Sequence, residues 1–210
     1  MFSFTVDAEH NKKHNELYRD SSRIGTAAFI FAAVLFVFAF IITRVYQGQV
    51  GYLMAAGLAI MGIISIFMGF TLPKKMGTPQ ELFDQFPLCP AIIAEVNGKD
   101  ITLLALVNRS VNPEATPIWA LTTRVVFGLP GHEIRVGERV PSVAVGGRRG
   151  LTSQELRAEI TPMPIAWGTP DKHVIDEAAQ QIPTNQWRRL ASQRSRLAEV
   201  KASRDNLVTL

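Results

Sequence analysis

Two long apolar runs, separated by a short polar connector, dominate the first third of the chain. Residues 24–43 and residues 51–70 each form a stretch of 20 residues without a charge. A bilayer core of roughly 30 Å requires about 20 helical residues, whereas a helix on the surface of a soluble protein keeps a polar face. The pattern predicts a transmembrane helical hairpin over residues 24–72, preceded by a polar tail over residues 1–23.

A signal peptide is the alternative interpretation of the first run. Residues 1–23 contain as many acidic as basic side chains, whereas a signal peptide begins with a basic segment. The apolar run is longer than a usual signal-peptide core, and no small-x-small cleavage site precedes the second run. We therefore expect the first run to remain in the protein as a membrane-spanning helix.

Lysine and arginine residues near the membrane ends predict the orientation of the hairpin. Four of them precede the first run and two follow the second, whereas the connector at residues 44–50 contains only Arg44. Basic residues accumulate on the cytoplasmic side of membrane proteins. We expect a plasma-membrane protein with both termini and the main domain in the cytoplasm and the connector outside.

The two runs differ in the surfaces that they offer to other helices. Gly51, Ala55 and Ala59 recur every four residues and share one helical face, and small residues let helices approach closely in lipid. Either this face packs on the first span, or the large phenylalanine surface, which includes Phe31 and Phe38, packs on the helices of another protein. The spans contain no His, Cys, Asp, Glu or Lys, so they offer poor ligands for haem or copper and no ionisable group for an ion pathway. The hairpin is predicted to be an anchor or a packing element.

Short apolar segments separated by turns follow the hairpin. Pro73, Gly77 and Pro79 predict a linker over residues 73–84, and Asn97-Gly98 is a strong signal for a β-hairpin. Five or six short strands in residues 85–168 favour a small antiparallel barrel or sandwich of OB or SH3 type, in an α+β membrane protein. The expected strands are residues 91–96, 101–107, 117–128, 130–145 in two pieces divided at Gly137, and 156–168, where prolines indicate an edge strand.

The remaining residues, 169–210, are predicted to be helical. Thr169 and Thr184 are candidate N-caps of two helices, and the second helix is strongly basic. Anionic lipid headgroups or an acidic partner surface are the expected contacts of these bases, and an ordinary solvated face is the alternative. Nucleic acid is disfavoured because the strands show no aromatic ladder for stacking bases. The basic residues are Arg188, Arg189, Arg194, Arg196, Lys201 and Arg204.

Three small groups of residues are candidates for a catalytic, metal-binding or phosphate-binding site. Cys89 is a candidate nucleophile with His132 or His173 as its base, although a cysteine between prolines more often packs as a small hydrophobic residue. His10 and His14 have helical i, i+4 spacing, which suits a metal but is also common by accident. The GGRRG segment, residues 146–150, suits a phosphate nest or a mobile loop. We predict no catalytic residue, cofactor or metal.

The segments ALTTRVVFGLPGHEIRVGERVPSVAV (120–145) and ITPMPIAWGTPDKHVIDEA (160–178) resemble the C-terminal domain of a family of small corynebacterial membrane proteins. The resemblance covers roughly residues 85–190. Such two-span proteins are similar to accessory subunits that accompany the cytochrome bcc–aa3 respiratory supercomplex of actinobacteria. The resemblance implies a chain that packs against core subunits, adds no redox centre and has no catalytic residues to transfer.

Three functional hypotheses follow. The first is a non-catalytic accessory subunit of a multi-subunit membrane complex, plausibly that respiratory supercomplex, which packs through its spans and covers the cytoplasmic face. The second is a membrane-tethered module that binds a soluble protein or an anionic ligand. The third is a hydrolase that uses Cys89 or a histidine.

Overall fold

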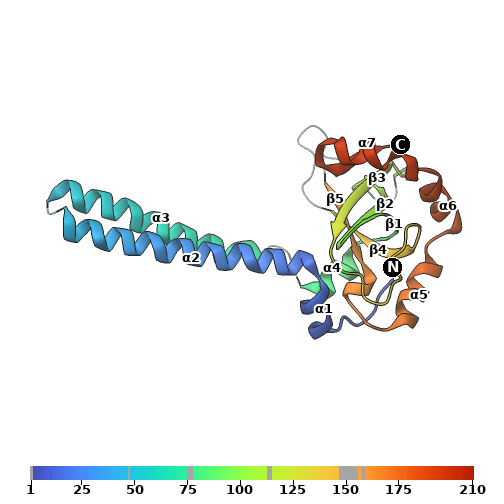
Figure 1. Ribbon diagram of the computed structural model, residues 1–210, viewed down its shortest axis with the longest axis horizontal. Coiled ribbons are helices and arrows are strands. Elements are labelled where there is room, and N and C mark those ends of the chain that lie inside the picture. Colours follow the sequence, from blue (N-terminus) through green and yellow to red (C-terminus); the bar gives the residue numbers. More distant parts are fainter. Residues whose placement is uncertain (1, 47, 75–77, 113–114, 147–155, 158) are drawn as a thin grey trace. The chain divides into compact units, whose positions relative to one another are not determined.

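The chain folds into two compact units. One unit contains Met1–Asn15 and Pro79–Leu210, and the other contains Glu16–Thr78. The chain therefore begins in the first unit, forms the second, and returns to complete the first (Figure 1). The computed structural model describes residues 2–46, 48–74, 78–112, 115–146, 156–157 and 159–210.

The unit Glu16–Thr78 is a hairpin of two long helices, α2 (Glu16–Val45) and α3 (Gln49–Lys74). Their apolar parts, Arg23–Val45 and Gln49–Thr71, are each 23 residues long and are long and apolar enough to cross a membrane. This confirms the predicted helical hairpin. The first helix begins earlier than the apolar run because an established helix is extended at little cost by residues without a helix breaker.

Small residues form the contact between the two helices. Ala32 and Ala39 of α2 are buried, as are Ala55 and Gly62 of α3. The ring of Phe36 lies so close to Gly62 that a Cβ atom there would stand 2.9 Å from the ring. The glycine hydrogen thus provides the space that the ring fills, which is how helices approach closely where water does not drive their association.

The other unit contains a six-stranded antiparallel sheet, curled into a half-barrel, in the order β5-β4-β1-β2-β3-β6 (Figure 1). The predicted fold class, two apolar helices followed by a small antiparallel barrel-like domain and C-terminal helices, is confirmed. The strands are β1 (Leu88–Asn97), β2 (Asp100–Asn108), β3 (Trp119–Val126), β4 (Arg139–Gly146), β5 (Ile160–Pro164) and β6 (Leu207–Thr209).

Two strand predictions are confirmed, although the second strand, expected over residues 156–168, spans only Ile160–Pro164. The β1–β2 hairpin turns at Asn97-Gly98, with Asn97 paired to Asp100 and a φ of 62° at Gly98 that suits glycine. The proline-containing strand β5 lies at one end of the sheet, where the missing N–H groups of Pro162 and Pro164 leave no gap between two strands.

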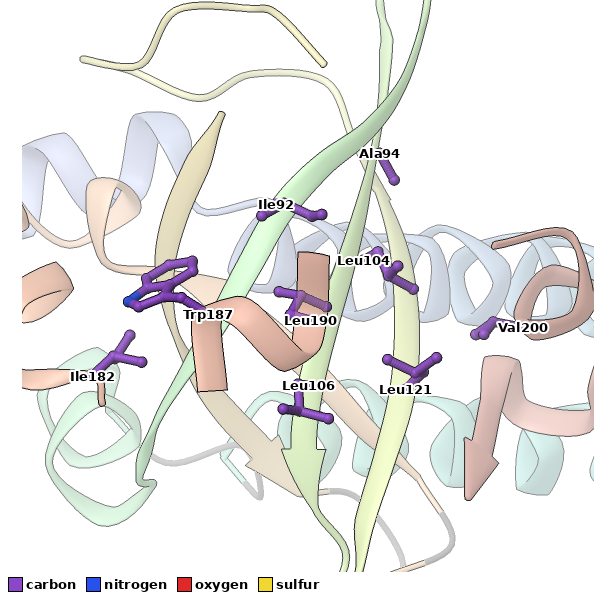
Figure 2. Close-up of a cluster of buried hydrophobic side chains, with 9 residues drawn as sticks. All are labelled: Ile92, Ala94, Leu104, Leu106, Leu121, Ile182, Trp187, Leu190 and Val200. Carbon is purple, nitrogen blue, oxygen red and sulfur yellow. The ribbon is translucent and has the colours of Figure 1, made fainter. Parts of the chain in front are cut away.

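Both faces of the central strands are buried. On one face, Ile92, Leu104 and Leu121 pack against Trp187 and Leu190 in a cluster that also contains Val200 (Figure 2). These partners come from α6 (Thr184–Ser192) and α7 (Leu197–Ala202). Alternate side chains of the same strands point the other way and are buried as well, among them Ala91, Ile93 and Leu103.

Residues 130–138 are not a strand, which corrects the prediction of a two-piece strand over residues 130–145. Gly131 and Gly137 have positive φ values of 78° and 92°. The chain therefore turns on both sides of residues 132–136. Only Gly137 and Glu138 pair with a strand, through two backbone hydrogen bonds with Ile93. Alternation alone cannot distinguish such a turn from a short strand.

The two predicted threonine N-caps are wrong. The hydroxyl of Thr169 accepts a hydrogen bond from the N–H of Asp171. Asp171 is itself the N-cap of α5 (Lys172–Gln181) and accepts from the N–H of His173. Thr184 is the first residue of α6, whose N-cap position is held by Pro183 without a side-chain hydrogen bond.

The basic C-terminal segment is not one helix. It contains α6, the 3-10 turn η2 (Arg194–Arg196), α7 and the 3-10 turn η3 (Arg204–Asn206). Asp205 and Asn206 have positive φ values and reverse the chain. Leu207 and Val208 then pair with the edge of β3 as strand β6, because pairing with a distant strand satisfies their backbone groups better than another exposed helical turn.

The first fifteen residues are part of the domain and not a separate tail. They form α1 (Ala8–His14), which Asp7 caps by accepting from the N–H of His10. The ring of Phe4 meets Phe83 edge-on at 5.1 Å. Phe83 lies in α4 (Pro79–Gln85), so the second half of the predicted linker is helical. The remaining element, η1 (Ile165–Trp167), is the short turn that contacts α1.

Candidate functional site

The hairpin presents a broad apolar surface that its own helices leave uncovered. Large apolar residues on both helices are about half exposed or more. Because such a surface is unfavourable in water, it must be covered by lipid or by other apolar helices. The members that are at least 60% exposed are Ile30, Phe40, Val45, Tyr46, Val50, Tyr52, Leu53, Ile63 and Phe67.

The five residues predicted to act in membrane packing fall into two groups. Gly51 and Ala55 are buried within the hairpin and Ala59 is partly buried. Phe31 and Phe38 remain about 52% and 54% exposed and lie seven residues apart on α2. The small-residue face therefore serves the contact with the first span, and the phenylalanine residues point outward.

Three of the bases in the C-terminal segment already have partners inside the domain. Arg189 lies over the ring of Trp119, with the guanidinium carbon 5.7 Å from the ring centre. Arg196 donates two hydrogen bonds of 2.8 Å to Glu199, and Lys201 pairs with Glu95 of β1. Hydrogen bonds from these bases lower the pKa values of Glu199 and Glu95. Arg189 and Lys201 thus hold the segment onto the sheet, whereas Arg196 and Glu199 join two successive turns of the segment itself.

The other bases in the segment remain exposed. Within the described part of the chain, no ion pair or ring contact holds Arg188 or Arg194, and Arg204 stands only 3.9 Å from the adjacent Asp205 with a side chain that is 96% exposed. Of the bases predicted to contact an anionic surface, Arg188, Arg194 and Arg204 are thus the ones that the described part of the domain engages least, and the contact itself stays a prediction.

A groove of about 380 Å³ lies beside α5 and α6. The guanidinium group of Arg139, from β4, stands 5.2 Å from the ring centre of Trp187. Asp176, Gln180 and Thr184 supply polar groups along the same groove. The volume is near the lower limit for a small-molecule site. Sequence reasoning missed it because Arg139 and Trp187 come from segments far apart in the chain, and nothing local links them.

The candidate nucleophile is buried. Cys89 lies in β1 and is 3% exposed, and burial raises the pKa of its thiol far above the usual range. The thiolate is the reactive form of cysteine, so this environment suppresses nucleophilic chemistry. The two candidate bases differ: His173 is exposed near the start of α5, whereas His132 is largely buried in the connection between β3 and β4. The environment of Cys89 favours a packing role.

The two N-terminal histidines do come together. Their rings lie on α1 with centres 4.5 Å apart, and the Nε2 atom of His10 is 2.9 Å from the carbonyl oxygen of Ala166. Burial, His10 and Lys13 lower the pKa of His14. Among the residues that the structure describes, no group of three or more His, Cys, Asp or Glu side chains is arranged to hold a metal. Arg148 and Arg149 of the GGRRG segment lie outside the described residues.

Comparison with known families matches residues 74–198 to a family described as "Protein of unknown function (DUF3239)". This match covers more than half of the chain. The chain belongs to the DUF3239 family. No curated protein matches the sequence.

One solved structure is similar to this DUF3239 chain. The structure, "Crystal structure of a putative membrane protein from Corynebacterium diphtheriae", is 44% identical, with a TM-score of 0.57. The similarity covers 59% of the present chain and 100% of the other. The predicted likeness to corynebacterial membrane proteins is thus confirmed, and the two apolar helices together with this neighbour support a membrane location.

Proposed function

We propose that this DUF3239 chain is a non-catalytic accessory subunit of a multi-subunit membrane complex. The proposal rests on the distribution of small and large residues in the hairpin. Small residues form the contact between its two helices, while Phe31, Phe38 and other large side chains face outward. An anchor needs only apolar character on its outer surface. Rigid aromatic rings at helical spacing additionally provide the shape that packing against another helix requires.

The connectivity of the domain supports a hairpin whose two ends reach the same compartment. Residues on both sides of the hairpin, Met1–Asn15 and Pro79–Leu210, form one compact unit. A folded unit cannot be assembled from segments on opposite sides of a bilayer, because irregular backbone is not tolerated in the lipid. The distribution of Lys and Arg favours the cytoplasm for this unit.

The proposed partners are integral membrane subunits, and the cytochrome bcc–aa3 supercomplex is the specific complex that we propose to test first. That choice rests on the resemblance described above, and the hairpin is compatible with it because it offers a packing surface without redox ligands. Arg188, Arg194 and Arg204 are proposed to contact lipid headgroups or an acidic surface of the partner. The buried thiol of Cys89 supports a non-catalytic role.

Native purification tests this function. The tagged chain, extracted in mild detergent, is expected to migrate on native gels with a multi-subunit complex and to co-purify with its subunits. Replacing both Phe31 and Phe38 by alanine is expected to lower recovery of the partners several-fold while the chain stays in the membrane. Leu53→Ala, which removes an even more exposed apolar side chain from α3, is the control and is expected to leave recovery of the partners unchanged. A chain that always migrates alone contradicts the proposal.

The groove at Arg139 favours a second candidate, a membrane-tethered binding module. A cation over an aromatic ring beside hydrogen-bonding side chains suits a ligand with a planar or anionic group. Under this alternative, a domain made of residues 1–15 linked to residues 79–210 retains a soluble partner without the hairpin. Arg139→Ala is expected to abolish that retention, and Arg188→Ala to leave it unchanged.

A further inference from the structure

The connection between β3 and β4, residues 127–138, contains a histidine in an unusual environment. The side chain of His132 is only 6% exposed. Its Nε2 atom is buried and has no hydrogen-bond partner among the residues that the structure describes. A buried polar atom normally has a partner, because leaving one without a partner costs about 1–3 kcal/mol. An imidazole held in this way is tolerated best while it is neutral.

Hydrogen bonds and the buried side chain of Leu129 hold the connection to the rest of the domain. Glu138 and Gly137 exchange backbone hydrogen bonds of 3.0 and 2.7 Å with Ile93 of β1. The carbonyl of Gly128 accepts a hydrogen bond of 2.9 Å from the indole of Trp167. Glycines at positions 128, 131 and 137 allow the backbone between these points to change direction at little steric cost. The segment is thus fastened near its ends, with His132 buried between them.

The charges around His132 compensate only in part for a proton on its ring. Glu138 stands 4.0 Å from Nδ1, and Asp176 of α5 adds a second negative charge near the ring. Glu138 already forms a 3.0 Å ion pair with Arg135, which also contacts Glu133. Burial is the largest effect and lowers the pKa of His132, while Glu138 and Asp176 act in the opposite direction.

We infer that the β3–β4 connection detaches from β1 and α5 when His132 takes up a proton in mildly acidic solution. The protonated ring would place an N–H donor at Nε2 in a site without an acceptor, whereas in the detached segment water solvates it. The direction of the pH dependence follows from the pKa of His132, which is lower in the attached state than in the detached state. The attached state therefore has its full stability above about pH 6.5, and this stability decreases as the pH falls below that value. Detachment exposes the backbone groups of Ile93, and the surface that it creates is more highly populated in acid.

Hydrogen exchange followed by mass spectrometry on the full chain in detergent tests the inference. A detached segment has an ordinary histidine pKa near 6.5, so lowering the pH from 7.5 to 5.5 increases its population by up to about tenfold. We expect amide protection in residues 127–138 to fall by that factor after correction for the intrinsic exchange rate. Protection in the β1–β2 hairpin is expected to remain constant except at Ile93, whose N–H donates to the carbonyl of Glu138 in the attached state.

Two variants distinguish protonation of His132 from protonation of other groups as the cause of increased exchange. His132→Gln is expected to remove the pH dependence of exchange in residues 127–138, and His173→Gln, at the exposed histidine of α5, to retain it. If His132→Gln does not fold, the ring proton resonances assigned to His132 in the unmodified protein replace it, and this ring must titrate below pH 6.5. Protection that does not change with pH, a dependence that survives His132→Gln, or a His132 ring that titrates at or above pH 6.5 would overturn the inference.

Discussion

At the scale of single residues, arginine and tryptophan form a recurring pair. The chain contains three tryptophans, and each has an arginine over its ring: Arg189 over Trp119, Arg124 over Trp167, and Arg139 over Trp187. A cation over an aromatic face contributes about 0.5–1 kcal/mol at exposed sites, and the arginine stem covers the ring as well. These pairs fasten strands and helices that are distant in the sequence.

Arg189→Ala is therefore expected to lower the free energy of unfolding of the domain by about 0.5–1 kcal/mol. Chemical denaturation followed by tryptophan fluorescence measures the change. Arg188→Ala is the matched control, since it removes the adjacent exposed arginine of the same helix, and we expect its effect to stay below about 0.5 kcal/mol. Equal effects of the two substitutions would show that the contact with Trp119 contributes nothing.

At the scale of elements, the hairpin shows why glycines of one helix are not equivalent. A Cβ atom at Gly62 would meet the ring of Phe36, and one at Gly69 would stand 3.1 Å from the ring of Phe29. At Gly57 nothing lies within 4 Å. Sequence spacing placed Gly51, Ala55 and Ala59 on one face, but it did not show which glycines the first helix approaches.

Gly62→Ile is expected to separate the two helices and to destabilise their contact by about 1–3 kcal/mol, as overpacking does elsewhere. The loss of helix signal during titration with a denaturing detergent measures this effect. Gly57→Ile inserts the same side chain at an open position of α3 and is expected to leave the transition unchanged. An unchanged transition for Gly62→Ile would contradict the packing described for Phe36.

At the scale of the whole molecule, the domain is assembled from both ends of the chain. Gln80 of α4 accepts a hydrogen bond from the N–H of Val6 and donates one to the carbonyl of Phe4, at 2.9 and 2.8 Å. The N–H of Asp7 donates to the carbonyl of Gly168. The hairpin is thus an insertion in the domain, and residues before it stabilise residues after it.

Gln80→Ala is expected to cost about 1–3 kcal/mol because it leaves the backbone groups of Phe4 and Val6 without their partner. Thermal unfolding of the full chain in detergent measures it. Gln181→Ala, at an exposed glutamine whose only described bond is to Glu177 in the same helix, is the control and is expected to shift the midpoint little. A stable Gln80→Ala variant would show that the first fifteen residues contribute little to the domain.

The sequence by itself determined the features that depend on neighbouring residues. Two uncharged runs of sufficient length are enough to predict membrane-spanning helices, and Asn97-Gly98 between apolar segments is enough to predict a β-hairpin. Both signals are local, because hydrophobic length and turn geometry are properties of consecutive residues. The proline-containing edge strand was predictable for the same reason.

Tertiary structure alone decided which distant segments meet. Residues 1–15 appear polar in the sequence, yet Phe2 and Asn11 are buried in the domain. Leu207 and Val208 follow a basic helical segment, yet they extend the sheet as β6. The partners of Arg189 and Lys201, and the buried position of His132, likewise depend on residues far away in the chain. Packing and long-range hydrogen bonding compete with local preference at these places, and the contacts that prevail are formed only when the whole domain has folded.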